Sequence, residues 1–118
     1  MKKLLLLIIT TTLFLSLISC GKITEYTKEF SYIPSYPGTT LKSTEPANEQ
    51  GFSKAIYLVK DTTISEVADN YERIFHDDGW KTTDNQKPTV FTVEKEKHIA
   101  VIALSQIDKD TNLFIYTK

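Results

Sequence analysis

The chain has a single cysteine, Cys20, among its 118 residues. One cysteine cannot form an intrachain disulfide, and small exported domains that depend on disulfides carry cysteines in pairs. The chain has only four glycines, and they do not cluster into a loop that could cradle a phosphate group. Motifs of serine hydrolases, zinc proteases and dithiol oxidoreductases are absent as well. The sequence therefore gives no sign of a catalytic centre, and we expect no cofactor and no metal.

The chain also lacks an excess of positive charge, since it has fourteen basic and fifteen acidic residues. Two of the basic residues, Lys2 and Lys3, fall within residues 1–19, which contain no acidic residue. The 99 residues from 20 to 118 thus carry twelve basic and fifteen acidic side chains, a formal charge of −3. Nucleic acid is not an expected partner of such a chain. Its length suits one small domain.

Residues 1–19 have the three parts of an export signal. Lys2 and Lys3 provide the positive start, residues 4–18 are apolar except for three threonines and Ser16, and the small Ser19 precedes Cys20. A membrane-spanning helix needs about 20 mostly apolar residues, and this run is shorter. We therefore interpret residues 1–19 as a signal peptide that is removed.

Leu17-Ile18-Ser19-Cys20 resembles the lipobox of bacterial lipoproteins. The resemblance implies a diacylglyceryl group on the sulfur of Cys20, acyl chains such as palmitate, and a mature chain that begins at Cys20. Two acyl chains anchor a protein stably, whereas one chain is marginal. The alternative is an ordinary secretory signal followed by a chance cysteine.

On the lipoprotein interpretation, the chain is bound to a membrane of the cell envelope through Cys20. Gly21, in place of an aspartate, follows that cysteine. By the resemblance, this implies the outer membrane, facing the periplasm, in a cell with two membranes. In a cell with one membrane, the domain would lie on its outer face.

Residues 20–35 are a candidate tether, and the domain itself is predicted over residues 36–118. The tether lacks the glycine and serine of a flexible linker and contains Tyr26, Phe30 and Tyr32. The sequence leaves open whether this segment is free, forms a short strand or rests on the domain. Together with Tyr36, its aromatic side chains have two interpretations, which are core packing and a surface that faces a partner or the membrane.

The pattern of residues 63–79 predicts an amphipathic helix. Thr63 and Glu66 fit a capping box, with Thr63 as the N-cap. Gly79 is the expected C′ residue, in a left-handed conformation, and Trp80 is then placed to pack back on Phe75. The apolar stripe occupies one face of this helix at offsets of three and four residues: Ile64, Val67, Ala68, Tyr71, Ile74 and Phe75.

Alternating β-prone segments surround this helix. We expect strands over residues 39–43, 54–60, 80–83, 89–94, 98–105 and 112–117, a loop over residues 44–53 and a turn over residues 84–88. Apolar residues on both faces of residues 54–60 suggest a central or well-covered strand. Connections this short favour antiparallel pairing. The order predicts an α+β fold, a two-layer sandwich with one helix on a mainly antiparallel sheet.

The part after Cys20 also resembles a set of small exported bacterial domains of unsettled function. The shared pattern is Tyr36-Pro37-Gly38, Tyr71 in the middle of the helix, and Gly79-Trp80. The resemblance implies a fold and carries no catalytic residue to this chain. Thr63, Gly79 and Trp80 are accordingly expected to be structural residues.

Three polar clusters are candidate sites. His76, Asp77 and Asp78 could begin a metal site, but a solvated helix end explains them better, with His76 complementing the helix dipole. Residues 108–112 begin like an EF-hand loop, yet Leu113 occupies the position that requires glycine, so a hairpin tip is expected. Residues 94–97, which alternate in charge, are expected to be a soluble tip or a protected edge.

The functional expectation is therefore a lipid-anchored, non-enzymatic envelope protein that binds a partner protein or a ligand. The alternatives are an envelope hydrolase that uses acidic residues and a purely structural or stress-related lipoprotein.

Overall fold

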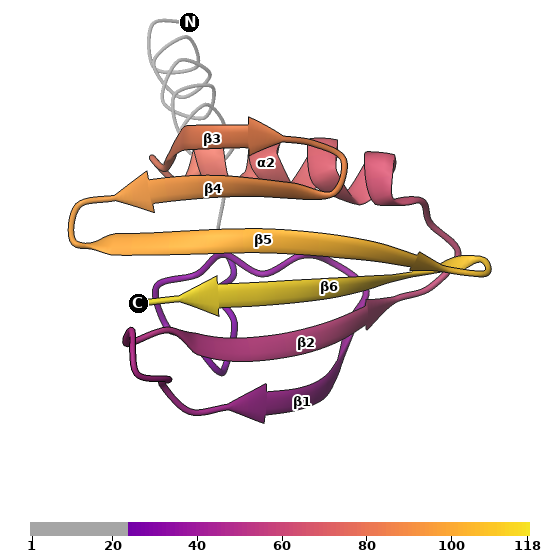
Figure 1. Ribbon diagram of the computed structural model, residues 1–118. Helices are drawn as coiled ribbons and strands as arrows, with labels where there is room; N and C mark the ends of the chain where they lie inside the picture. Colours follow the sequence, from indigo (N-terminus) through magenta and orange to yellow (C-terminus); the bar gives the residue numbers. More distant parts are fainter. Residues whose placement is uncertain (1–23) are drawn as a thin grey trace, which may run out of the picture.

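The computed structural model describes residues 24–118; Cys20, the signal peptide and the start of the tether lie outside the described residues. One helix packs on a six-stranded antiparallel sheet, as Figure 1 shows, so the predicted α+β sandwich is confirmed. In chain order the elements are β1 (Thr39–Glu45), β2 (Ser53–Val59), α2 (Ile64–Asp77), β3 (Lys81–Gln86), β4 (Val90–Lys95), β5 (His98–Ile107) and β6 (Asp110–Thr117).

The strands lie in the order β1-β2-β6-β5-β4-β3, and every neighbouring pair is antiparallel. The C-terminal strand β6 therefore lies in the middle of the sheet, between β2 and β5 (Figure 1). Each of these two neighbours pairs with β6 over seven or more residues. This arrangement gives β6 two full ladders of backbone hydrogen bonds and explains why most of its residues are buried.

Helix α2 begins and ends where the sequence predicts. The N-cap Thr63 accepts a hydrogen bond from the backbone N–H of Glu66 through its side chain. The returning half of the capping box differs, because the Glu66 carboxylate accepts from the hydroxyl of Thr62. At the C-terminal end, Gly79 has a φ of +91° and donates to the carbonyl of His76. This is the left-handed C′ conformation that glycine adopts without steric cost.

Trp80 completes this helix end. Its backbone N–H donates to the carbonyl of Phe75, the long hydrogen bond that defines a Schellman motif. Its ring meets the ring of Phe75 edge to face, with the centroids 5.2 Å apart. The predicted contact between Trp80 and Phe75 is thus confirmed, and it fixes the angle at which the chain enters β3.

The core lies between the sheet and a second layer. From α2 it receives Val67, Ala68, Tyr71 and Phe75, which are all buried. The alternate residues of the strands supply the rest of this buried face: Ala55, Tyr57, Val59, Phe91, Val93, Ala100, Ile102, Leu104, Leu113 and Ile115.

The segment 24–36 completes the second layer beside α2, on the same side of the sheet (Figure 1). Ile33 is fully buried, and the Tyr71 hydroxyl donates to the carbonyl of Pro34 over 2.7 Å. The Tyr57 hydroxyl donates to the Glu29 carboxylate over 2.5 Å. The pKa of Tyr57 is raised mainly by burial and, to a smaller extent, by this hydrogen bond. The candidate tether therefore rests on the domain from residue 24 onward, a question that the sequence left open.

The other face of the sheet, called the open face here, lies opposite both α2 and the segment 24–36. Its apolar residues are half-buried or exposed, not buried, and they include Ile56, Leu58, Val90, Ile99, Val101, Ala103, Ile107, Phe114 and Tyr116. Of the two expected alternatives for β2, a central strand is confirmed, because β2 pairs with β1 and β6, whereas full cover on both faces is not found. Ala55, Tyr57 and Val59 meet the core, whereas Ile56 and Leu58 lie on the open face.

Three further differences concern strand bounds. β1 reaches Glu45 and so includes residues expected in the loop 44–53. β3 reaches Gln86, so Asp84 lies in a strand and the turn is confined to residues 87–89. β1 and β3 are both edge strands with polar side chains, and each has an irregularity in its register. Residues this polar are expected in loops when only the sequence is considered. β5 and β6 extend to the tip at residues 108–109, where Asp108 has a φ of +52°.

Glu72 ties α2 to the β3–β4 hairpin and makes stability depend on pH in acid. Burial raises the pKa of Glu72, but the hydrogen bonds from Lys87 and Thr82 outweigh it and lower this pKa from its ordinary 4.5. A carboxyl with a lowered folded pKa stabilises the fold above the unfolded pKa, and this contribution is lost as the pH falls through the folded pKa. We expect the free energy of unfolding to drop below pH 4.5 by more in the wild type than in Glu72→Gln. Urea denaturation of both proteins from pH 7 to pH 3 measures this, and parallel curves would contradict it.

Candidate functional site

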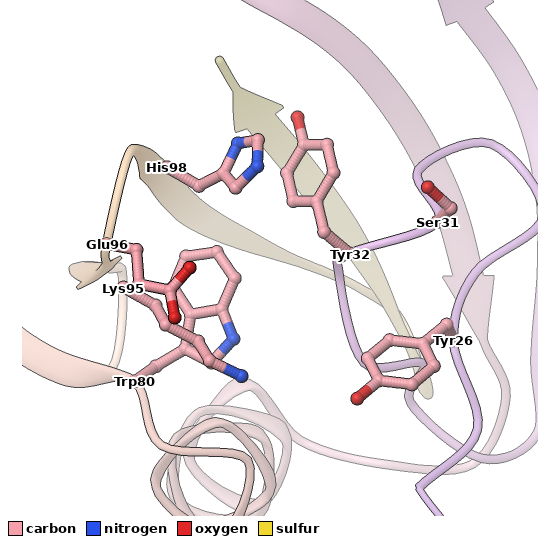
Figure 2. Close-up of a pocket in the computed structure, with 7 residues that line it drawn as sticks. All are labelled: Tyr26, Ser31, Tyr32, Trp80, Lys95, Glu96 and His98. Atoms are coloured by element: carbon pink, nitrogen blue, oxygen red, sulfur yellow. The ribbon is translucent and has the colours of Figure 1, made fainter.

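A pocket of about 280 Å³ lies where the segment 24–36, the end of α2 and the β4–β5 hairpin meet. Figure 2 shows Tyr26, Ser31 and Tyr32 on one side of it, and Trp80, Lys95, Glu96 and His98 on the other. Three of these seven side chains are aromatic and three carry ionisable nitrogen or carboxylate groups. The pocket is therefore suited to a small group that has a flat or apolar part for the aromatic rings and a polar part for the ionisable side chains.

Local structure explains how these side chains come together. Trp80 is held by the Schellman motif at the end of α2, and it is almost fully buried. Glu96 occupies the tip of the β4–β5 hairpin with a φ of +54°. Tyr26 is brought in by its isolated bridge with Pro34, which folds the segment back on itself. Sequence elements seventy residues apart thus meet in this pocket.

Asp78 does not line the pocket itself but connects three of the side chains that do, namely Tyr26, Trp80 and Lys95. Its carboxylate accepts hydrogen bonds from the hydroxyl of Tyr26 over 2.8 Å and from Nε1 of Trp80 over 3.2 Å. The ammonium of Lys95 lies 3.4 Å from the same carboxylate and donates to the Asp78 carbonyl over 2.6 Å. The hydrogen bond to Asp78 raises the pKa of Tyr26. An acidic residue at a helix C-terminus is destabilised by the helix dipole. At Asp78, the hydrogen bonds from Tyr26, Trp80 and Lys95 offset this unfavourable interaction.

The charges of Asp78 and Lys95 balance each other, which leaves Glu96 as the uncompensated charge of the pocket. Within residues 24–118, the Glu96 carboxylate forms no ion pair with a cationic side chain. Glu96 is exposed, and its side chain is directed to the same space as Tyr26 and Tyr32 in Figure 2. The net charge that a ligand would meet there is negative.

His98 and Tyr32 come from opposite sides of the pocket and meet to form one wall at its end. Their rings stack with centroids 3.6 Å apart and planes within 11° of parallel. The Tyr32 hydroxyl lies 3.2 Å from the hydroxyl of Thr117, which holds the ring against β6. Nδ1 of His98 is buried and has no hydrogen-bond partner among the described residues. The wall therefore presents aromatic faces and edges to the pocket.

Aromatic faces together with an uncompensated carboxylate favour a cation. The negative face of a tyrosine or tryptophan ring attracts an ammonium or guanidinium group by about 0.5–2 kcal/mol. A carboxylate adds a charge-assisted hydrogen bond, which is stronger than a neutral one. The arrangement can thus bind a guanidinium or ammonium group without any chemical step.

The residues that the sequence analysis names as structural or aromatic candidates lie at the helix ends, at the pocket or in the core. Thr63 and Gly79 cap α2, and Trp80 both closes the helix and lines the pocket. Of the four aromatic residues in question, Tyr36 is buried, Phe30 and Tyr32 are half-buried, and Tyr26 is 45% exposed. Tyr26 and Tyr32 belong to the pocket, and Tyr36 belongs to the core, where its ring meets that of Tyr71.

The polar clusters resolve into structural contacts. His76 lies 2.8 Å from the hydroxyl of Thr82, and residues 108–109 form a hairpin tip. No group of three or more potential metal-ligating side chains occurs in residues 24–118. From the sequence, Lys95 and Glu96 are expected in a soluble tip or a protected edge and not at a pocket, because nothing in the local pattern shows that Tyr26 and Tyr32 lie across from them.

The fold and the pocket together define a small α+β domain with an aromatic, negatively charged pocket beside its N-terminal segment. Comparisons with protein families, with curated proteins and with solved structures find no match for this chain. Among residues 24–118, no helix is both long enough and apolar enough to cross a membrane.

Proposed function

We propose that the protein is a lipid-anchored, non-enzymatic module of the cell envelope that binds an exported partner protein by one cationic side chain. The observation that carries this proposal is the pocket of Figure 2, with Tyr26, Tyr32 and Trp80 around a space where Glu96 is the unbalanced charge. A space of about 280 Å³ is sized for a side chain and not for a folded surface.

The predicted anchor places this pocket near the membrane. Cys20 precedes Tyr26 by six residues, which span at most about 20 Å when extended. A partner that reaches the pocket would therefore be bound close to the lipid surface. The anchor is proposed on the lipobox resemblance, and the pocket is proposed on its own geometry.

Binding of a cationic group is expected to change the fluorescence of Trp80, which is the only tryptophan in the chain. The probe is N-acetylarginine amide, titrated into the full chain in detergent. We expect Glu96→Gln, which removes the charge and keeps the shape, to bind about tenfold more weakly, a difference of about 1.4 kcal/mol. The matched control is Glu94→Gln, because Glu94 is on the same hairpin and faces the open side of the sheet.

Equal affinities of Glu96→Gln and wild type would contradict a cation site. Equal affinity for the neutral analogue N-acetylglutamine amide would contradict it as well. The anchor is tested separately by radiolabelled palmitate, whose incorporation Cys20→Ala is expected to abolish. Labelling that persists in Cys20→Ala would overturn the anchor and leave the pocket proposal standing.

A further inference from the structure

Glu29, in the segment 24–36, is a half-buried carboxylate that no ion pair compensates among the described residues. One of its oxygens accepts a hydrogen bond from the hydroxyl of Tyr57, and no other group of residues 24–118 donates to this carboxylate. Burial and this hydrogen bond raise the pKa of Tyr57. The shared proton therefore stays on the phenol, and the negative charge stays on Glu29.

Two hollows of the surface have Glu29 in their lining. The smaller hollow, of about 310 Å³, lies beside the start of β1, where Tyr26 and the exposed Leu41 line it. The larger hollow, of about 370 Å³, lies beside the end of β1, where Phe30 and Pro46 line it. Glu29 is therefore accessible to a ligand and has aromatic and aliphatic surface around it, as Glu96 has in the pocket of Figure 2.

The two lysines of these hollows form no ion pair with Glu29. Lys54 lines the larger hollow, but its ammonium pairs with Glu45 at 3.2 Å and lies over two aromatic rings of the open face. Lys28 lines the smaller hollow, is exposed, and forms no ion pair within residues 24–118. A ligand would thus meet no net charge in the smaller hollow and one negative charge, that of Glu29, in the larger hollow.

Tyr26 connects these hollows to the pocket of Glu96. Its side chain is 45% exposed and lines both that pocket and the smaller hollow, so the two adjoin at Tyr26. Tyr26 and Glu29 are three residues apart, which places their Cα atoms within about 11 Å of each other. A continuous surface therefore runs from Glu96 past Tyr26 to Glu29. It has an uncompensated carboxylate at each end and no net charge between them.

This charge pattern is complementary to an extended peptide with a basic residue at each end. Resting on the function proposed above, we infer that the exported partner presents a segment with two basic residues, one bound at Glu96 and the other at Glu29, separated by uncharged residues over Tyr26 and the smaller hollow. The first contact holds the second basic residue close to its carboxylate. The second contact is then made within the complex, so the two affinities reinforce each other.

The test compares short peptides on the full chain in detergent, with the fluorescence of Trp80 as the signal from the Glu96 pocket. The dibasic peptides are N-acetylated amides with two arginines separated by one to four glycines, which set the arginine Cα atoms about 7–17 Å apart when extended. Each matched peptide has glutamine in place of the second arginine. We expect the best dibasic peptide to bind the wild type about tenfold more tightly than its matched peptide, a difference of about 1.4 kcal/mol.

Glu29→Gln removes the charge and keeps an acceptor for the Tyr57 hydroxyl, so its thermal unfolding should match that of the wild type. It is expected to abolish the tenfold gain and to leave the affinity for N-acetylarginine amide unchanged within about twofold. The matched control is Glu25→Gln, an equal change of charge at an exposed residue of the same segment that lines neither hollow nor the Glu96 pocket. We expect this control to alter neither affinity.

The outcomes separate this inference from the proposed function. If Glu96→Gln leaves the affinity for N-acetylarginine amide unchanged, the pocket proposal fails and the inference fails with it. If Glu96→Gln weakens that binding but the dibasic peptides bind no more tightly than their matched peptides, only the inference is overturned. A gain that persists in Glu29→Gln would also overturn it. So would an equal loss in Glu25→Gln and Glu29→Gln, because the gain would then reflect the overall charge of the chain.

Discussion

Replacing Phe75 with alanine is expected to lower the free energy of unfolding by about 3–5 kcal/mol. Phe75 is fully buried, and its ring touches Tyr71, Trp80 and Phe91. The substitution removes a large apolar side chain and leaves a cavity that the sheet and the helix cannot both close. Because Phe75 also packs on Trp80, the loss weakens the end of α2 as well. Urea denaturation followed by Trp80 fluorescence and by circular dichroism measures the effect.

Ile74→Ala is the matched control for this prediction. Ile74 precedes Phe75 on the same helix and is only partly buried against the core. Alanine favours a helix more than isoleucine does, so part of the lost packing is offset. We expect a loss of about 1 kcal/mol or less at this position. Equal losses at the two positions would contradict the assignment of Phe75 to the centre of the core.

Replacing Ile33 with alanine is expected to cost about 2–5 kcal/mol, although Ile33 precedes the first strand. Ile33 is fully buried in the core, although it belongs to the segment that the sequence presents as a candidate tether. A free tether would tolerate this change without a measurable effect on stability. A large loss would therefore establish that the segment 24–36 is part of the folded domain. The measurement is the thermal and urea unfolding of the full chain.

Ser31→Ala provides the comparison within the same segment. Ser31 is exposed at the rim of the pocket, so its replacement is expected to change stability by no more than about 0.5 kcal/mol. Proteolysis offers a second measurement, since a docked segment resists cleavage in the native state. If Ile33→Ala and Ser31→Ala unfold alike, the segment does not contribute to the core.

The helix was predictable almost residue by residue because its signals are local. Thr63, the apolar stripe and Gly79-Trp80 all act within one or two turns of α2, so neighbouring positions in the chain determine them. The hairpin tips at residues 96–97 and 108–109 were predictable for the same reason. The polar edge strands were less so. Asp84 and Glu45 lie in strands only because β4 and β2 provide hydrogen-bonding partners for them.

The pocket could be predicted only in part. Tyr26 and Tyr32 stood out as aromatic residues of uncertain role, and Trp80 stood out as a structural residue. Lys95 and Glu96 gave no signal beyond their charge. The pocket residues come together through Asp78, which contacts Tyr26, Trp80 and Lys95, and Tyr26 is fifty-two residues from Asp78 in the chain.

The sequence by itself determined the class of fold, the bounds of the helix and the absence of an intrachain disulfide, since periodicity, capping residues and cysteine count are properties of the chain alone. It also led to the lipid anchor at Cys20, which remains a prediction. Tertiary structure decided that β6 enters the middle of the sheet, that the segment 24–36 shares the core with α2, and that one face of the sheet stays open. These features depend on which distant surfaces bury one another, and local patterns of polarity do not encode that choice.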